Sequence, residues 1–119
     1  MTGEKKNPLS VLRAMEVLAK ELGGDAPLSY VRALMYVAQA GDAGLDQSAL
    51  ARLLDASPSA TGRAVQALGA FSWLKDEAGN KRPGLDLIHS EQSPQNFRLR
   101  TLTLTSKGKA LVSKLGGVK

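Results

Sequence analysis

The sequence contains no cysteine and a single histidine, His89. Disulfide bonds and cysteine-ligated zinc sites are therefore excluded. A structural zinc ion normally takes four nitrogen or sulfur ligands, so one histidine supported by carboxylates would be an unusual site. We expect neither a metal ion nor a cofactor.

Long apolar runs are also missing. No segment approaches the roughly 20 apolar residues that are needed to span a bilayer. The first eight residues are polar and are followed by an amphipathic stretch, which is not the pattern of a signal peptide. The expected compartment is the cytoplasm, without membrane contact.

Residue combinations typical of catalysis are equally scarce. The sequence offers no evident pair of carboxylates, no nucleophile with a matching base and no glycine-rich phosphate loop. Asp42, Asp46 and Asp55 fall at expected turns and helix starts, where aspartate is common for local structural reasons. We therefore predict that the protein is not an enzyme.

The composition instead favours a small basic binding protein. The chain has 119 residues, the size of one domain, and 43% hydrophobic and 23% charged residues are ordinary for a globular protein. The net charge of +5 favours an anionic partner such as nucleic acid. The alternative is a basic surface that is merely solvated.

Residues 1–8, with Lys5 and Lys6, are predicted to form a flexible basic arm, and residues 9–119 a single domain. In the first helix, residues 9–22, apolar side chains recur at spacings of four, three and four, with two more beside this stripe. The stripe and its flanks comprise Val11, Met15, Leu18 and Leu22, flanked by Leu12 and Ala19.

Three further helices are expected before the apolar periodicity changes. The second runs from about Pro27 to Ala40, is apolar nearly all round, and so is expected to be central, with Leu28 on its buried face. The third helix is predicted over residues 47–54, with Asp46 as its cap and with Leu50, Leu53 and Leu54 pointing inward. The fourth is predicted over residues 58–70, with Ser57 as its cap and with Thr61, Ala64, Val65 and Leu68 buried.

After the fourth helix, the spacing of the apolar residues changes to the alternation that is typical of strands. Residues 77–84 are polar and read as a loop, residues 85–90 alternate as a strand, and residues 97–104 form the return strand. A final helix starts near Ser106. A short helix, a tight turn, a second helix and a hairpin together predict a winged helix-turn-helix, mainly α with a small β-hairpin wing (α+β).

Three segments, in this order along the chain, resemble the MarR family of bacterial transcription regulators. Residues 45–54 (LDQSALARLL) and 57–65 (SPSATGRAV) resemble the family's T-Q-S-E-L-A-x-x-L and S-P-S-T-V-T-R-x-V. Residues 102–108 (LTLTSKG) resemble its strand-to-helix junction V-x-L-T-x-K-G. The resemblance covers roughly residues 28–115 and implies a winged-helix regulator that binds double-stranded DNA.

The sequence departs from the family pattern in three places. The loop at 77–84 and the first wing strand are longer than usual. In the wing motif D-x-R, Arg98 matches the arginine, but Asn96 replaces the aspartate that normally orients it. The chain also stops at Lys119, whereas MarR proteins usually continue into a further dimer-forming helix. We therefore expect a homodimer through the first helix, using Val11, Leu12, Met15, Leu18, Ala19 and Leu22.

The expected DNA contacts lie on the fourth helix and the wing. The predicted set is Ser57, Ser59, Ala60, Gly62, Arg63, Gln66, Arg98 and Arg100. Arg63 would contact a phosphate or a guanine, the alternative being a solvated surface arginine. Arg98 would enter a minor groove, while Arg100, Lys81 and Arg82 are weaker candidates for backbone contacts.

Three functions remain open from the sequence. The first is a sequence-specific regulator that binds a pseudo-palindromic operator as a homodimer. The second is a winged helix of phage or plasmid replication or other DNA handling, and the third is a protein-interaction module. MarR relatives often bind small aromatic effectors, but no residue pattern here supports one.

Overall fold

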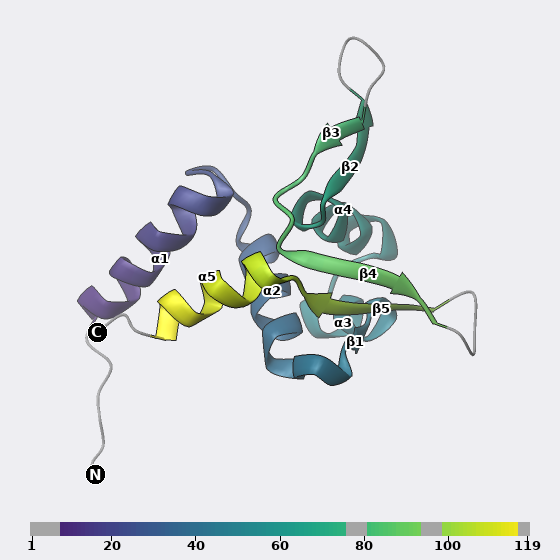
Figure 1. Ribbon diagram of the computed structural model, residues 1–119, viewed down its shortest axis with the longest axis horizontal. Coiled ribbons are helices and arrows are strands. Elements are labelled where there is room, and N and C mark those ends of the chain that lie inside the picture. Colours follow the sequence, from purple (N-terminus) through teal and green to yellow (C-terminus); the bar gives the residue numbers. More distant parts are fainter. Residues whose placement is uncertain (1–7, 76–80, 94–98, 117–119) are drawn as a thin grey trace.

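The computed structural model describes residues 8–75, 81–93 and 99–116 (Figure 1). Its helices are α1 Pro8–Leu22, α2 Leu28–Ala40, the 3₁₀ turn η1 Gly41–Ala43, α3 Gln47–Leu54, α4 Pro58–Leu68 and α5 Ser106–Gly116. Its strands are β1 Leu45–Asp46, β2 Phe71–Lys75, β3 Lys81–Pro83, β4 Ile88–Gln92 and β5 Arg100–Leu104. The predicted winged helix-turn-helix class is confirmed. Within these residues, no helix is both long and apolar enough to cross a bilayer.

Helix α2 lies at the centre of the fold and packs against α3, α4, α5 and β5. Ala33, Leu34 and Val37 are fully buried, which confirms the predicted central position. Leu28, predicted to be buried, is 71% exposed. At 100° per residue it falls on the opposite side of the helix from the buried stripe. Leu53 of α3 is likewise exposed, so its predicted inward orientation is wrong.

The main sheet has three antiparallel strands in the order β1-β5-β4. We call β4 and β5 the wing hairpin; it projects away from the helices on the right of Figure 1. The first wing strand begins at Ile88, later than predicted, because residues 85–87 leave the ladder and bind other elements. The predicted alternation fails here, since Leu87 and Ile88 are both buried while His89 is exposed.

A second hairpin, β2–β3, follows α4 in the chain and projects at the top of Figure 1, apart from the wing hairpin. Its strand β3 lies within the segment 77–84 that was predicted as a loop, so that prediction is wrong in part. The register places Phe71 opposite Pro83 and Lys75 opposite Lys81. A polar segment with two glycines and a proline has no alternation of apolar residues, which explains why the pattern did not indicate a strand.

The segment that leaves this hairpin closes the C-terminal end of α4. Four backbone N–H groups donate to carbonyls at or just beyond that end: Gly84 to Ala70 (2.9 Å), Leu85 to Ala67 (3.1 Å), Asp86 to Gly69 (2.8 Å) and Leu87 to Leu68 (2.7 Å). Helix ends leave carbonyls without helical partners, and these bonds satisfy them. Residues 84–87 therefore fix the end of α4.

The start of α5 holds the same segment from the other side. The Thr105 hydroxyl donates to the Asp86 carbonyl (2.6 Å) and accepts from the Gly108 N–H (3.0 Å), so Thr105 caps α5. Lys107 Nζ donates to the Leu85 carbonyl (2.9 Å). Residues 105–108 of the L-T-x-K-G junction thus form a clasp on residues 85–87, and through them connect α5 to α4.

Candidate nucleic-acid interface

The turn between α3 and α4 is set by local chemistry. Asp55 ends α3 in the left-handed conformation, with φ 53°. Two residues later, the Ser57 hydroxyl accepts a hydrogen bond from the Ala60 N–H at 3.0 Å, and Pro58 occupies the first turn. The predicted serine cap is confirmed. Asp46 is the N-cap residue of α3, as predicted, but the predicted capping hydrogen bond of its side chain is not made.

Helix α4 is buried on one side and accessible to solvent on the other. Thr61, Ala64, Val65 and Leu68 are buried, as predicted. The predicted contact residues on this helix are all accessible: Ser57, Ser59, Ala60 and Arg63 are exposed, and Gly62 and Gln66 are half-buried. The sequence therefore predicted correctly which face of α4 is available to a partner.

The predicted wing residues divide into two groups. Arg100 is described and exposed at the first position of β5. Arg98 and Asn96 lie outside the described residues, as do the side chains of Lys81 and Arg82. Their predicted roles stay predictions.

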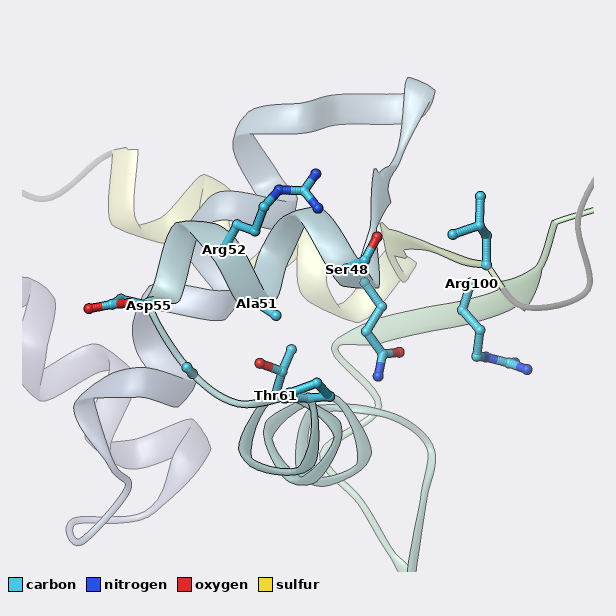
Figure 2. A pocket seen from close by; sticks show the side chains of 10 residues that line it. Ser48, Ala51, Arg52, Asp55, Thr61 and Arg100 are labelled. Carbon is cyan, nitrogen blue, oxygen red and sulfur yellow. The ribbon is translucent and has the colours of Figure 1, made fainter.

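A hollow of about 480 Å³ lies between α3, the start of α4 and β5 (Figure 2). Ala51 and Arg52 line it from α3, Thr61 lies opposite on α4, and Arg100 borders it from β5. The hydroxyl of Thr61 is buried and has no hydrogen-bond partner among the residues described. No group of three or more metal-binding side chains occurs in the described part of the chain.

A second hollow, of about 390 Å³, separates α4 from the wing hairpin, and we call it the helix–wing groove. Its lining combines small, apolar and polar residues, which include Gln47, Gly62, Val65, Gln66, Asp86, Ile88, His89, Ser90, Arg100 and Thr105. Arg100 lines both hollows. The sequence did not single out Gln47 or Ser90, because only the pairing of β4 with β5 brings Ser90 to this groove.

Gly62 keeps the helix side of the groove open. A Cβ at this position would meet only the Gln47 amide nitrogen, at an ordinary contact distance of 3.8 Å. The fold would therefore accept an alanine here without rearrangement.

We expect Gly62→Ala to stabilise the protein and to weaken the DNA binding that the sequence predicts for this face of α4. Alanine in a helix interior is favoured over glycine by about 0.8–1 kcal/mol, so the thermal midpoint should rise. The added methyl group narrows the helix–wing groove and should reduce DNA affinity by roughly 1 kcal/mol. Thermal unfolding and a DNA titration on the same preparation test both effects. Unchanged affinity in the stabilised variant would show that DNA does not approach this side of α4.

Similar proteins were sought by sequence and by structure. No protein-family model matches the sequence, and a search of curated proteins finds no significant match. Solved structures do match. The S. aureus MepR–DNA complex is 18% identical, with a TM-score of 0.65 over 93% of this chain and 79% of that one. The fold is that of the MarR-type winged helix.

Two other solved structures, from different organisms, match the fold with similar TM-scores. Rv1404 from Mycobacterium tuberculosis is 24% identical, with a TM-score of 0.63 over 92% of this chain and 63% of that chain. A MarR transcriptional regulator from Methanosarcina mazei is 17% identical, with a TM-score of 0.62 over 93% and 69%. These likenesses, each over more than 90% of this chain, establish the shared fold.

Proposed function

We propose that this chain is a MarR-family transcription regulator that binds double-stranded DNA in a sequence-specific manner. The observation that carries the proposal is the joint presentation of two basic elements. Helix α4 lines the helix–wing groove through Gly62 and Gln66 and carries Arg63 on its exposed face, and the exposed Arg100 lines the groove from the wing hairpin. The MepR–DNA complex supports it, because MepR has the same fold and was solved with DNA.

The chemistry of α4 fits a helix that enters the major groove. In helix-turn-helix proteins the N-terminal residues of the second helix meet base edges. Here Ser59 and Gln66 carry hydrogen-bonding side chains, and Arg63 can donate two parallel bonds to a guanine. Ala60 can contact a thymine methyl group, and Gly62 lets the backbone approach closely. Few of these side chains can read a base, so the shape of the DNA should contribute to specificity.

Selection of bound sites from a random DNA pool, followed by titration at several salt concentrations, tests this function. We expect one sequence to be enriched. We also expect the logarithm of affinity to fall with the logarithm of salt by about 0.9 for each neutralised phosphate. Binding that is flat in salt would contradict a DNA-binding role. Salt-dependent binding without an enriched sequence would favour general DNA handling over regulation.

We further propose that the regulator acts as a homodimer through α1. A helix-turn-helix protein usually pairs to read two half-sites about one DNA turn apart. Val11, Leu12 and Met15 are each at least half exposed, whereas Leu18 is buried and Ala19 and Leu22 are half-buried. The predicted stripe therefore divides, with its C-terminal half anchoring α1 to the core and its N-terminal half left for a partner.

The exposed half of α1 is continuous with further apolar surface. Met15 of α1 and Leu28 and Val31 of α2 line a shared groove between the two helices. Leu28 lies on the side of α2 that faces away from the core, and the half-buried Val31 lies between that side and the core. In the proposed dimer, a second copy of the chain packs on this surface.

We expect Leu12→Glu to give a folded monomer with weakened binding to a two-half-site DNA. Leu12 is 51% exposed, so a charge there would be tolerated in the monomer but not at an apolar interface. Sedimentation and thermal unfolding measure the two properties separately. Leu18→Glu serves as the contrasting variant, because Leu18 is only 8% exposed and its replacement should unfold the protein. A wild-type protein that sediments as a monomer at tens of micromolar, and binds DNA as one copy per site, would rule out the dimer.

A further inference from the structure

Arg100 is held in one orientation by Ser90 of the neighbouring strand. Its Nε donates to the Ser90 hydroxyl at 2.7 Å, and its Nη2 donates to the Ser90 carbonyl at 3.0 Å. In the register of the wing hairpin, Ser90 lies opposite Leu102 and Gln92 lies opposite Arg100. Ser90 and Arg100 are therefore diagonal neighbours on one face of the hairpin, within reach of a long side chain.

This face of the hairpin is the one that packs on the core. Ile88 and Leu102, which share it, are buried, and farther along the hairpin Ser90 is half-buried and Arg100 is exposed. Burial on this face therefore decreases from Ile88 and Leu102 to Arg100. Figure 2 shows Arg100 on β5 at the border of the first hollow, and Arg100 lines the helix–wing groove as well.

The two bonds to Ser90 leave much of the guanidinium available. Arginine carries five N–H donors in a planar fork, and Ser90 takes two of them. The remaining three have no hydrogen-bond partner within the described ranges. A planar fork with free donors suits the oxygens of a phosphodiester, and its fixed position reduces the conformational entropy lost on binding.

We propose that Arg100 binds a DNA phosphate at the mouth of the helix–wing groove, and that Ser90 is the positioning residue that orients it. The proposal rests on the DNA-binding function proposed above. It places the DNA backbone between α4 and the wing hairpin, in the groove that Gln47, Gln66 and Arg100 line. Arg100 is then an ordered wing contact that does not depend on the D-x-R motif of residues 96–98.

Four variants test the proposal: Arg100→Ala, Ser90→Ala, the double variant and Ser90→Thr. Each is titrated with the selected DNA site at several salt concentrations, and thermal unfolding confirms that each is folded. We expect Arg100→Ala to reduce the salt slope by about 0.9, the equivalent of one phosphate. Ser90→Ala should cause part of the same loss, because it removes the hydroxyl but keeps the carbonyl acceptor.

The double variant shows whether Ser90 acts on DNA binding through Arg100 or independently of it. If Ser90 acts through Arg100, Ser90→Ala should change nothing further once Arg100 is alanine, and Ser90→Thr should restore wild-type affinity. Equal losses from Ser90→Ala in both backgrounds would overturn the positioning role.

An unchanged salt slope in Arg100→Ala, with Arg63→Ala still weakening binding, would overturn the phosphate contact but leave the proposed function standing. No salt-dependent binding by the wild-type protein would instead refute the proposed function itself.

Discussion

Replacing Arg63 with alanine should weaken binding to the selected DNA site by about 1–3 kcal/mol, roughly 5- to 150-fold in affinity. Arg63 is exposed in the second turn of α4, on the side opposite the buried residues Thr61 and Leu68. A guanidinium at this place can donate two bonds to the O6 and N7 atoms of a guanine in the major groove. Those bonds form only on the correct base, so their loss should fall mainly on the specific site.

Titration of the selected site and of a random duplex at the same salt concentration distinguishes the two roles of Arg63. Loss on the selected site alone indicates base recognition, whereas equal loss on both indicates a phosphate contact. Lys114→Ala provides a control for net charge, because Lys114 is exposed on α5 and carries the same unit charge. If Arg63→Ala binds both duplexes as the wild type does, Arg63 is not part of the interface.

The helix-turn-helix could be predicted because its helix boundaries depend on residues close by in the sequence. Ser57 and Pro58 start α4, and Asp46 and Asp55 bound α3, Gln47–Leu54. The buried side of α4 follows from helical periodicity alone. Neither feature requires knowledge of a distant residue, so sequence reasoning found both.

The wing was predicted less well because its geometry depends on distant partners. Residues 85–87 alternate as a strand would, yet they bind the end of α4 and the start of α5 instead of a neighbouring strand. Strand β1 is only two residues long, too short for any periodicity, and exists because Leu45 pairs with Leu102. The Ser90–Arg100 contact depends on the same register, which the sequence does not specify.

The strand-to-helix junction at residues 102–108 matches a family pattern whose physical cause the sequence does not reveal. The resemblance to V-x-L-T-x-K-G marked Thr105, Lys107 and Gly108 without giving them a role. The structure gives each one a contact with residues 85–87. Their positions follow from a three-way junction of α4, α5 and the wing hairpin, which only the folded chain assembles.

Gly108→Ala should be strongly destabilising for this reason. A Cβ at Gly108 would fall inside van der Waals contact with the Leu87 carbonyl, and also close to the Leu104 side chain. The Leu87 oxygen belongs to the backbone and accepts the Thr105 N–H at 3.0 Å, so it cannot move without breaking the clasp. We expect the free energy of unfolding to fall by about 3 kcal/mol. The thermal midpoint should fall by on the order of 10 °C.

Gly116→Ala on the same helix is the matched control. Its Cβ would meet nothing within 4 Å, so the change in stability should stay below about 1 kcal/mol. Thermal unfolding of the two variants compares the same chemical change in a crowded and in an open position. Because the clasp holds the segment that closes the end of α4, Gly108→Ala should also weaken DNA binding at temperatures where the protein is still folded. A Gly108→Ala protein as stable as Gly116→Ala would show that α5 can move away from residues 85–87 at little cost, and that the clasp does not fix α4.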